Sequence, residues 1–259
     1  MVEKSSSSSE SKVKIGYFSS TRIALIAILG ALAGILYIFD FPLSFAFPSF
    51  LNFKLVDIPV LISSFVLGPV SAAITVVVEV LIKLVAKGTS TAFRGELADL
   101  LLGFAFAVPA GLIYSKKRTF KGALLGIGIG ALCEVAVALL ANKFILVPFY
   151  VKKYGWGAII GMMTSLFPSC TEENFYNIYL WVSVLPFNLL RCLVSSVINI
   201  LVYKRLSIVI NRIHAKVQPK EAEGEVKAKK INLAVLLVGI AIVLLLVLFT
   251  LLRYFVFRR

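Results

Sequence analysis

The sequence predicts an all-α membrane protein built from six helices, with one extra C-terminal transmembrane helix. Hydrophobic residues make up 59% of the chain and charged residues 15%, whereas soluble domains average roughly 45–50% and about 25%. Several apolar runs reach the roughly 20 residues that are needed to cross about 30 Å of hydrocarbon. A transmembrane β-barrel would instead show short alternating segments, and the sequence shows no such pattern.

The first predicted helix covers residues 18–38 and carries small side chains along one face. Ala27 and Ala31 are four residues apart, with Gly30 and Gly34 beside them. Small residues let two helices approach closely in a membrane, where no hydrophobic effect drives their association. This face therefore packs either inside the protein or against another subunit.

Residues 39–59, FDFPLSFAFPSFLNFKLVDIP, are rich in phenylalanine but interrupted by prolines. Proline disfavours helix interiors, so this segment is not expected to form a membrane helix. We expect residues 39–56 to form a lid that closes over a binding site with an apolar inner surface. Its predicted contact residues are Phe45, Phe47, Phe50, Leu51 and Phe53. The alternative is an aromatic belt that rests on the lipid headgroups.

The remaining helices follow from apolar runs that are separated by polar or glycine-containing turns. A second helix is predicted at 57–67, and the Gly-Pro pair at 68–69 separates it from a third at 70–86. The fourth, fifth and sixth are predicted at 97–114, 122–148 and 176–203. Residues 18–206 are therefore assigned to one six-helix membrane domain.

The two ends of the chain differ from this domain. Residues 1–17 are rich in serine, which predicts a disordered cytoplasmic tail. Residues 207–230 are expected to form a charged cytoplasmic linker. Residues 231–255 are expected to form the additional transmembrane helix, because residues 231–252 are almost entirely apolar.

Basic residues predict the orientation of a multi-pass protein, because they accumulate in cytoplasmic loops. A cytoplasmic N-terminus places sixteen of the 27 Lys and Arg residues on the cytoplasmic side, in the N-terminal segment, in the run 116–121 and in residues 204–230. We therefore expect the N-terminus inside and residues 39–56 outside. The same placement of charge argues against nucleic acid as a partner, although the net charge is +14.

Ionisable groups inside membrane spans are costly and tend to be functional. Several lie toward the outer ends of their predicted helices, which places them at one depth and predicts a polar-lined pocket open to the outside. They are Asp57, Glu96, Lys143 and Arg191, together with the neutral Asn142. Glu79 and Lys83, four residues apart on one helix face, either neutralise each other or join the pocket. Glu134 is a candidate for a hydrogen bond between helices.

Motifs for catalysis and ATP hydrolysis are absent from the sequence. There is no GxxxxGK[ST], GxSxG or HExxH, and the single histidine, His214, lies in a basic segment. We therefore expect neither an enzyme, nor a metal site, nor a bound cofactor. There is also no clear inverted repeat with broken helices, the usual sign of a self-sufficient transporter. A pocket without its own energy source implies a partner that supplies energy.

Four blocks of the sequence resemble, in the same order, the substrate-binding S components of energy-coupling factor (ECF) vitamin transporters. The blocks are LVDIPVLISSFVLGPVSAAITVVVEVLIKL, GTSTAFRGELADLLLGFAFAVPAGLIY, ALLANKFILVPFY and LPFNLLRCLVSSVINILVYKRL. The resemblance covers about residues 20–206 and is strongest to the riboflavin-specific members.

This resemblance implies a binding protein of the bacterial cell membrane that docks on a transmembrane T subunit and two cytoplasmic ATPases. Ala27 and Ala31 would contact the T subunit. Riboflavin would be captured outside, under the lid. ATP-driven movement of the whole S component would then carry the vitamin inward.

The resemblance also assigns the site. The family's flavin pocket uses a carboxylate at Asp57, an asparagine at Asn142 and a basic residue at Arg191, where Asp57 and Arg191 replace the more usual Glu and Lys. The family's GELAN block reads GELAD, so Asp99 replaces an amide. The candidate binding residues are Asp57, Lys83, Thr89, Glu96, Asp99, Asn142, Asn188 and Arg191. Thr89, Ser90 and Thr91 are candidate hydroxyl contacts, and the alternative for this GTST segment is a helix-capping turn.

Two other functions fit the same features. One is an S component for another vitamin, such as folate, pantothenate or a queuosine precursor. The other is a membrane assembly protein whose polar residues only link helices.

Overall fold

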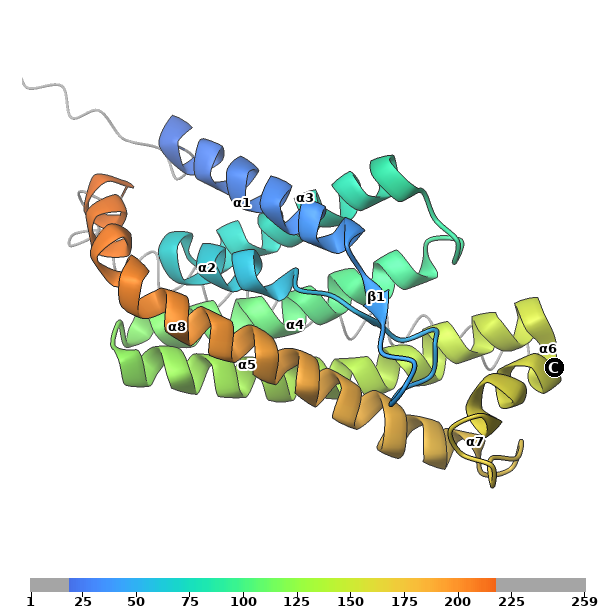
Figure 1. The fold of residues 1–259 in the computed structure, drawn as a ribbon. Coiled ribbons are helices and arrows are strands. Elements are labelled where there is room, and N and C mark those ends of the chain that lie inside the picture. The colour runs from blue at the N-terminus through green and yellow to red at the C-terminus, as the bar shows by residue number, and fades with distance from the viewer. Residues whose placement is uncertain (1–18, 218–259) are drawn as a thin grey trace, which may run out of the picture.

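The computed structural model describes residues 19–217. The predicted tail and additional transmembrane helix, and most of the predicted linker, therefore lie outside the described residues. The described part forms six helices or helical runs, which confirms an all-α membrane protein of six helices (Figure 1). They are α1 (Ser20–Ile38), α2 (Asp57–Leu67), α3 (Pro69–Lys87), α4 (Arg94–Lys116), the run α5 (Phe120–Ala141), η1 (Asn142–Leu146) and α6 (Val147–Thr164), and the run α7 (Phe175–Asn177), η2 (Ile178–Val184) and α8 (Leu185–Val217).

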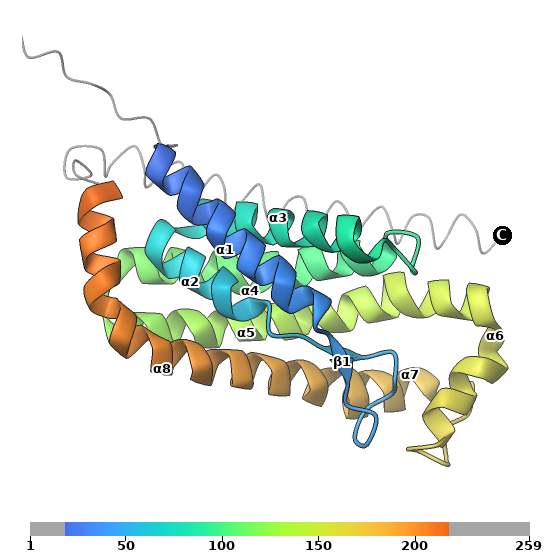
Figure 2. The same cartoon turned by 45° about the horizontal axis from the view of Figure 1, so that its top comes forward.

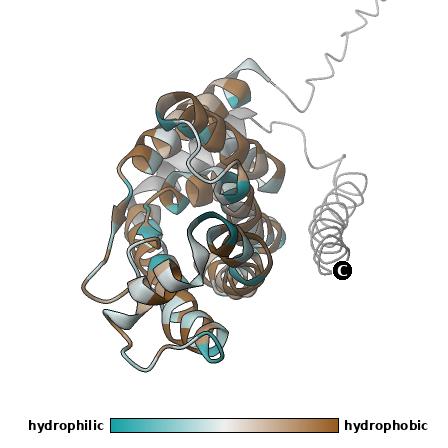
Figure 3. Cartoon of the chain, turned by 90° about the vertical axis from the view of Figure 1, so that its right-hand side faces the viewer, coloured by the Kyte–Doolittle hydropathy of each residue, from teal (hydrophilic) through white to brown (hydrophobic). Residues whose placement is uncertain are grey.

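Five helical segments within residues 19–217 are long and apolar enough to cross a membrane, whereas α2 has only 11 residues. Most of the helical ribbon is hydrophobic (Figure 3). Large apolar side chains such as Ile28, Leu132 and Leu201 are exposed on its outer faces. Exposed apolar surface of this extent is typical of a protein that lipid surrounds.

The helices run back and forth, so their connections gather at two ends of the bundle. α1 packs on α3, α4 packs on α3 and α5, and α8 packs on α2 and α5. The segment 39–56, the α3–α4 loop and α6 lie at one end, which we call the lid end (Figures 1 and 2). The start of α1, the α4–α5 turn and the end of α8 lie at the opposite end.

Residues 39–56 form no helix, as predicted, but fold into a small hairpin. Strands β1 (Phe41–Pro42) and β2 (Asn52–Phe53) pair antiparallel, with Phe41 opposite Phe53. The Phe47 N–H donates to the Leu43 carbonyl at 2.9 Å, which closes a turn between the strands. The segment is therefore ordered by its own backbone hydrogen bonds as well as by its apolar side chains.

The predicted end of the fifth helix at residue 148 is wrong, because the helical run continues to Thr164. Pro148 lies inside this helical run, where its missing N–H and its ring disfavour a regular α-helical turn. The turn before it widens into the π-helical segment η1, in which the Val147 N–H donates to the Asn142 carbonyl. Gly155 divides α6 into two helical segments, because its φ of 79° and ψ of 160° are non-helical and suit a residue without a Cβ.

The sixth helical run shows the same effect of proline. The π-helical segment η2 ends at Val184, two residues before Pro186. Proline lacks an N–H, and its ring clashes with the carbonyl four residues earlier. This clash explains both widened turns, η1 before Pro148 and η2 before Pro186. α8 then continues to Val217, beyond the predicted domain boundary at 206. No proline or glycine interrupts residues 204–217, so the local sequence gives the helix no reason to stop there.

The small residues of α1 divide into two sets. A Cβ at Gly30 would lie 2.6 Å from Val78, and one at Gly34 would lie 2.6 Å from Ile82, so both glycines allow close contact with α3. Ala27 and Ala31 are exposed instead. The glycine pair therefore serves internal packing, and the alanine pair stays open on the surface of the described residues.

Glycines also set the approach of α5 to α4. A Cβ at Gly126 would lie 2.7 Å from the Ala110 carbonyl oxygen, and one at Gly130 would overlap the Phe106 carbonyl oxygen. The opposing atoms belong to the backbone, so they cannot move aside as a side chain can.

We predict that Gly130→Ala lowers the free energy of unfolding by about 1–3 kcal/mol, because the added methyl forces α4 and α5 apart. Gly128→Ala is the matched control, since a Cβ there meets nothing within 4 Å. Unfolding of the purified protein by SDS titration, followed by circular dichroism, gives both values. An equal loss in the two variants would contradict this packing.

Candidate functional site

A cavity of about 300 Å³ lies at the lid end, enclosed by the lid segment and by residues of α1, α3, α4, η1, α6 and α8. Its polar lining residues are Asp40, Asn52, Lys54, Lys83, Lys87, Ser90, Thr91, Glu96, Asp99, Asn142, Asn188 and Arg191. Its larger apolar and aromatic lining residues are Tyr37, Phe50, Leu51, Leu102, Leu146, Tyr150 and Phe187. Small-molecule sites typically have roughly 300–1,000 Å³ and combine aromatic walls with a few placed polar groups.

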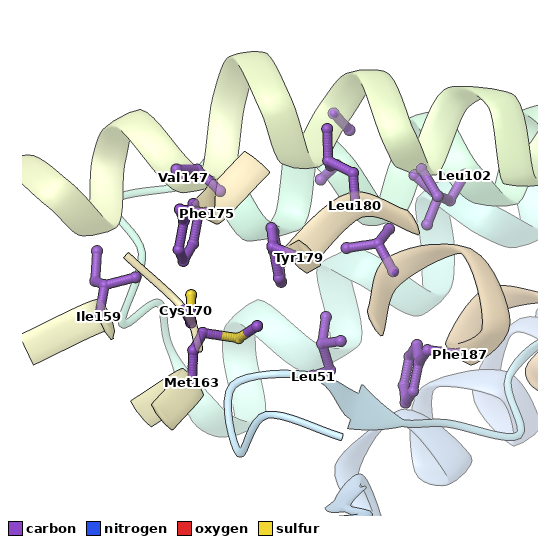
Figure 4. Packing of buried hydrophobic residues seen from close by; sticks show 14 of the residues in the cluster. Leu51, Leu102, Val147, Ile159, Met163, Cys170, Phe175, Tyr179, Leu180 and Phe187 are labelled. Atoms are coloured by element: carbon purple, nitrogen blue, oxygen red, sulfur yellow. The ribbon is translucent and has the colours of Figure 1, made fainter. Parts of the chain in front are cut away.

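Two of the predicted lid residues line the cavity. The Phe50 ring lies 5.8 Å from the Tyr150 ring and 5.4 Å from the Tyr179 ring, measured between centroids. Leu51 is buried in the same apolar cluster as Phe187 (Figure 4). These contacts hold the lid against α6, η2 and α8.

The other predicted lid residues have different surroundings. Phe47 and Phe53 pack edge-on against Phe187, at centroid distances of 5.2 and 6.3 Å, and support the lid from outside the cavity. Phe45 is 83% exposed and is not part of the buried cluster. The lid therefore has an inner apolar face, while Phe45 belongs to its outer surface.

Arg191 lies between two buried carboxylates at the inner end of the cavity. Its Nε is 3.3 Å from Asp57 Oδ2 at the start of α2, and its guanidinium also forms an ion pair with Glu134 of α5. Ser195 donates to Asp57 at 3.4 Å, and the Cys192 thiol donates to Glu134 at 2.8 Å. The Arg191 side chain thus links α2, α5 and α8, and Glu134 fulfils its predicted role between helices.

The predicted alternative in which Glu79 neutralises Lys83 is wrong. Lys83 forms an ion pair with Glu96, because α4 begins beside the end of α3. The other oxygen of Glu96 accepts hydrogen bonds from Thr89 and Thr91, each at 3.0 Å. Glu79 is 2% exposed, and its Oε2 has no hydrogen-bond partner within the part of the chain that the structure describes.

The GTST segment forms the turn that begins α4. Thr89 accepts hydrogen bonds from the backbone N–H groups of Thr91 and Phe93, at 3.3 and 3.0 Å, and Thr91 accepts one from Gly95 at 3.0 Å. Only the bond from Gly95 satisfies an N–H in the first turn of α4, whereas the N-cap residue Phe93 has no side-chain cap and the bonds to Thr89 order the turn before the helix. Thr91 lines the cavity and Thr89 does not, so a ligand contact by Thr89 stays a prediction without support from its position.

Sequence reasoning missed two ion pairs that join the lid segment to the helices. Lys54 Nζ lies 2.6 Å from Asp99 Oδ2, and the Tyr37 hydroxyl donates to the same carboxylate. Lys87 Nζ lies 2.5 Å from Asp40 Oδ1. Asp40 and Lys54 stood out as charged residues in an aromatic segment, and that contrast was the available signal.

Of the two asparagines of the predicted site, Asn142 is the first residue of η1, and Asn188 lies in α8 one turn after the end of η2. Asn142 accepts a hydrogen bond from the Tyr179 hydroxyl at 2.5 Å and donates to the Ala138 carbonyl at 2.8 Å. Asn188 donates to the Val184 carbonyl at 2.8 Å. Both side chains line the cavity. π-Helical turns often occur at functional sites, because they change the direction in which side chains point.

Six of the candidate binding residues therefore meet at the cavity: Lys83, Glu96, Asp99, Asn142, Asn188 and Arg191. Asp57 lies behind Arg191, and Thr89 lies behind Glu96. Within residues 19–217, no group of three or more His, Cys, Asp or Glu side chains is placed to hold a metal ion.

The fold and the site define a multi-pass membrane protein with a lidded polar cavity at one end of its helical bundle. Residues 21–203 match the family model described as ECF transporter, substrate-specific component. The chain therefore belongs to this family of substrate-specific (S) components. It is a component of a transporter and not an enzyme.

Curated relatives and a solved structure agree with this assignment. The chain is 29% identical to the riboflavin transporter RibU of Staphylococcus aureus over 201 residues, which cover 77% of this chain and 97% of the relative. It is 28% identical to the riboflavin transporter RibU of Streptococcus thermophilus, in an alignment that covers 75% of this chain and 87% of the relative. It is 19% identical to the riboflavin transporter FmnP of Bacillus subtilis, in an alignment that covers 71% of this chain and 91% of the relative.

A solved structure described as "Structure and mechanism of the S component of a bacterial ECF transporter" superposes with a TM-score of 0.57 at 28% identity, and the match covers 73% of this chain and 96% of that one. The similarity thus extends over nearly the whole of that structure.

We predict that Glu134→Ala lowers the free energy of unfolding by about 3 kcal/mol, because it removes one of the two carboxylates that neutralise a buried guanidinium. Glu172→Ala is the control, since Glu172 is an exposed loop residue and its loss is expected to change stability by less than about 0.5 kcal/mol. SDS titration of both variants measures the difference. Equal stability of the two variants would show that the ion pair with Glu134 does not hold the helices.

Proposed function

We propose that this S component binds riboflavin in the cavity under the lid. The observation that carries the proposal is the lining of the cavity, in which aromatic rings lie beside neutral amides and a fixed guanidinium. Relatives named as riboflavin transporters, which align over most of the chain, support the same ligand.

The chemistry of the lining suits a flavin. The isoalloxazine ring is flat and amphipathic, so it can stack on the rings of Phe50, Tyr150 or Phe187. The ring edge and the ribityl hydroxyls need donors and acceptors. Asn142, Asn188 and the hydroxyl-bearing loop 88–93 present such groups along the cavity wall.

We further propose that the lid end faces the outside of the cell and that the N-terminus is cytoplasmic. The basic run 116–121 lies at the α4–α5 turn, opposite the lid end, which supports this orientation under the positive-inside rule (Figure 1). In this arrangement riboflavin enters from outside under the lid. A T subunit and two ATPases then drive its delivery to the cytoplasm.

The exposed pair Ala27 and Ala31 is the proposed contact with the T subunit. Both residues lie on the outer face of α1, where small side chains permit a close approach by another membrane helix. Gly30 and Gly34 are already occupied by α3 and are not available for this contact.

Riboflavin binding is tested by titrating the purified protein with riboflavin and following the quenching of flavin fluorescence. We predict one-to-one binding, and roughly tenfold weaker binding by Asn188→Ala, which removes one cavity hydrogen-bonding group. Asn177→Ala is the matched control, an exposed asparagine in the same helical run. No binding by the wild-type protein would refute the proposal, and unchanged affinity in Asn188→Ala would refute the role of that amide.

The subunit contact is tested with Ala27→Trp. We predict that this variant binds riboflavin normally but loses ATP-dependent uptake in proteoliposomes that contain the T subunit and ATPases, because the bulky side chain keeps the helices apart. Ile28→Trp is the control, since Ile28 is the 62% exposed neighbour. Full uptake by Ala27→Trp would exclude this face as the docking surface.

A further inference from the structure

We infer that the cavity selects an uncharged ligand and that Asp40 is a specificity-determining residue, because it keeps Lys87 from binding an anionic group. This inference rests on the proposed function and concerns which chemical form of the vitamin the site accepts.

The cationic residues of the cavity are already neutralised by protein carboxylates. Among the described residues, four Lys and Arg side chains line the cavity, and each forms an ion pair. The pairs are Lys54 with Asp99, Lys83 with Glu96, Lys87 with Asp40, and Arg191 with Asp57 and Glu134. The wall therefore offers no excess of positive charge to a ligand.

The carboxylates are also held by neutral donors, which keeps them in place. Glu96 accepts two threonine hydroxyls at 3.0 Å. Asp99 accepts the Tyr37 hydroxyl, and Asp40 accepts the Asn52 amide at 3.0 Å. Releasing a lysine for an anionic ligand would break the ion pair and leave a fixed carboxylate without its cation beside the ligand.

An anionic group in this cavity would lose its hydration without gaining a free cation, and an unpaired charge in such surroundings is strongly disfavoured. A neutral ligand needs only hydrogen bonds and apolar contacts. The charge pattern thus favours riboflavin over its 5′-phosphate. It also disfavours carboxylate-bearing vitamins such as folate and pantothenate.

Lys87 and Asp40 form the most exposed of these pairs. Their side chains are 40% and 20% exposed, against 15% and 3% for Lys83 and Glu96. Exposed ion pairs contribute little to stability, so this pair can be changed with small effect on the fold. Asp40 belongs to the lid segment and Lys87 ends α3, which places the pair at the edge of the cavity.

The test compares riboflavin with riboflavin 5′-phosphate by fluorescence titration, and its readout is the ratio of the two dissociation constants. For the wild-type protein we expect the phosphate to bind at least about 100-fold more weakly. Asp40→Asn is expected to reduce this ratio about tenfold, because it frees Lys87 for the phosphate. The double variant Asp40→Asn/Lys87→Gln removes the freed cation and is expected to restore the ratio.

Glu172→Gln serves as a control for net charge, because it removes one negative charge from an exposed loop. A ratio that falls equally in Glu172→Gln would overturn the specific role of Asp40. Equal affinity of the wild-type protein for both flavins would overturn the inference and leave the proposed function intact. Failure to bind riboflavin would instead overturn the proposed function, and this inference with it.

Discussion

The ion pairs of Arg191 set the geometry on which the cavity depends. Arg191 is 5% exposed and contacts Asp57 and Glu134, which are 3% and 0% exposed. Separating these charges inside a membrane would leave each without a partner, so α2, α5 and α8 are held at one relative depth. Asp57 also begins α2, where the helix dipole favours a negative charge. The place where the lid ends and the helix starts is therefore fixed by the same contact that forms the inner end of the cavity.

The lid segment, residues 39–56, is held by two kinds of contact with the helices around the cavity. Its Phe50 and Leu51 pack into the aromatic cluster of α6, η2 and α8, while Lys54 and Asp40 bind carboxylate and ammonium partners on α4 and α3. The apolar contacts fix the lid in place, and the polar contacts neutralise the charges that surround the site. A site that is lidded, aromatic and internally neutralised suits a flat, uncharged vitamin.

Much of the fold could be predicted because apolar runs and their interruptions report directly on membrane helices. Residues 39–56 were recognisable as a non-helical segment from Pro42 and Pro48. The effect of Pro148 was missed, since a proline in the first turn of α6 widens the turn before it instead of ending the helix. The partners of charged residues were harder to predict. Lys83 pairs with Glu96 and not with Glu79, because α4 begins beside the end of α3. The spacing of residues along one helix does not reveal such a contact between two helices.

Riboflavin is proposed to bind in the cavity between the lid and Arg191. An experimental structure of the full chain, purified in the presence of riboflavin, would locate the ligand. We expect flavin density enclosed by Phe50, Tyr150 and Asn188, with the lid closed over it. Flavin density at any other place on the protein, or a cavity that stays empty while the protein is saturated with riboflavin, would contradict it.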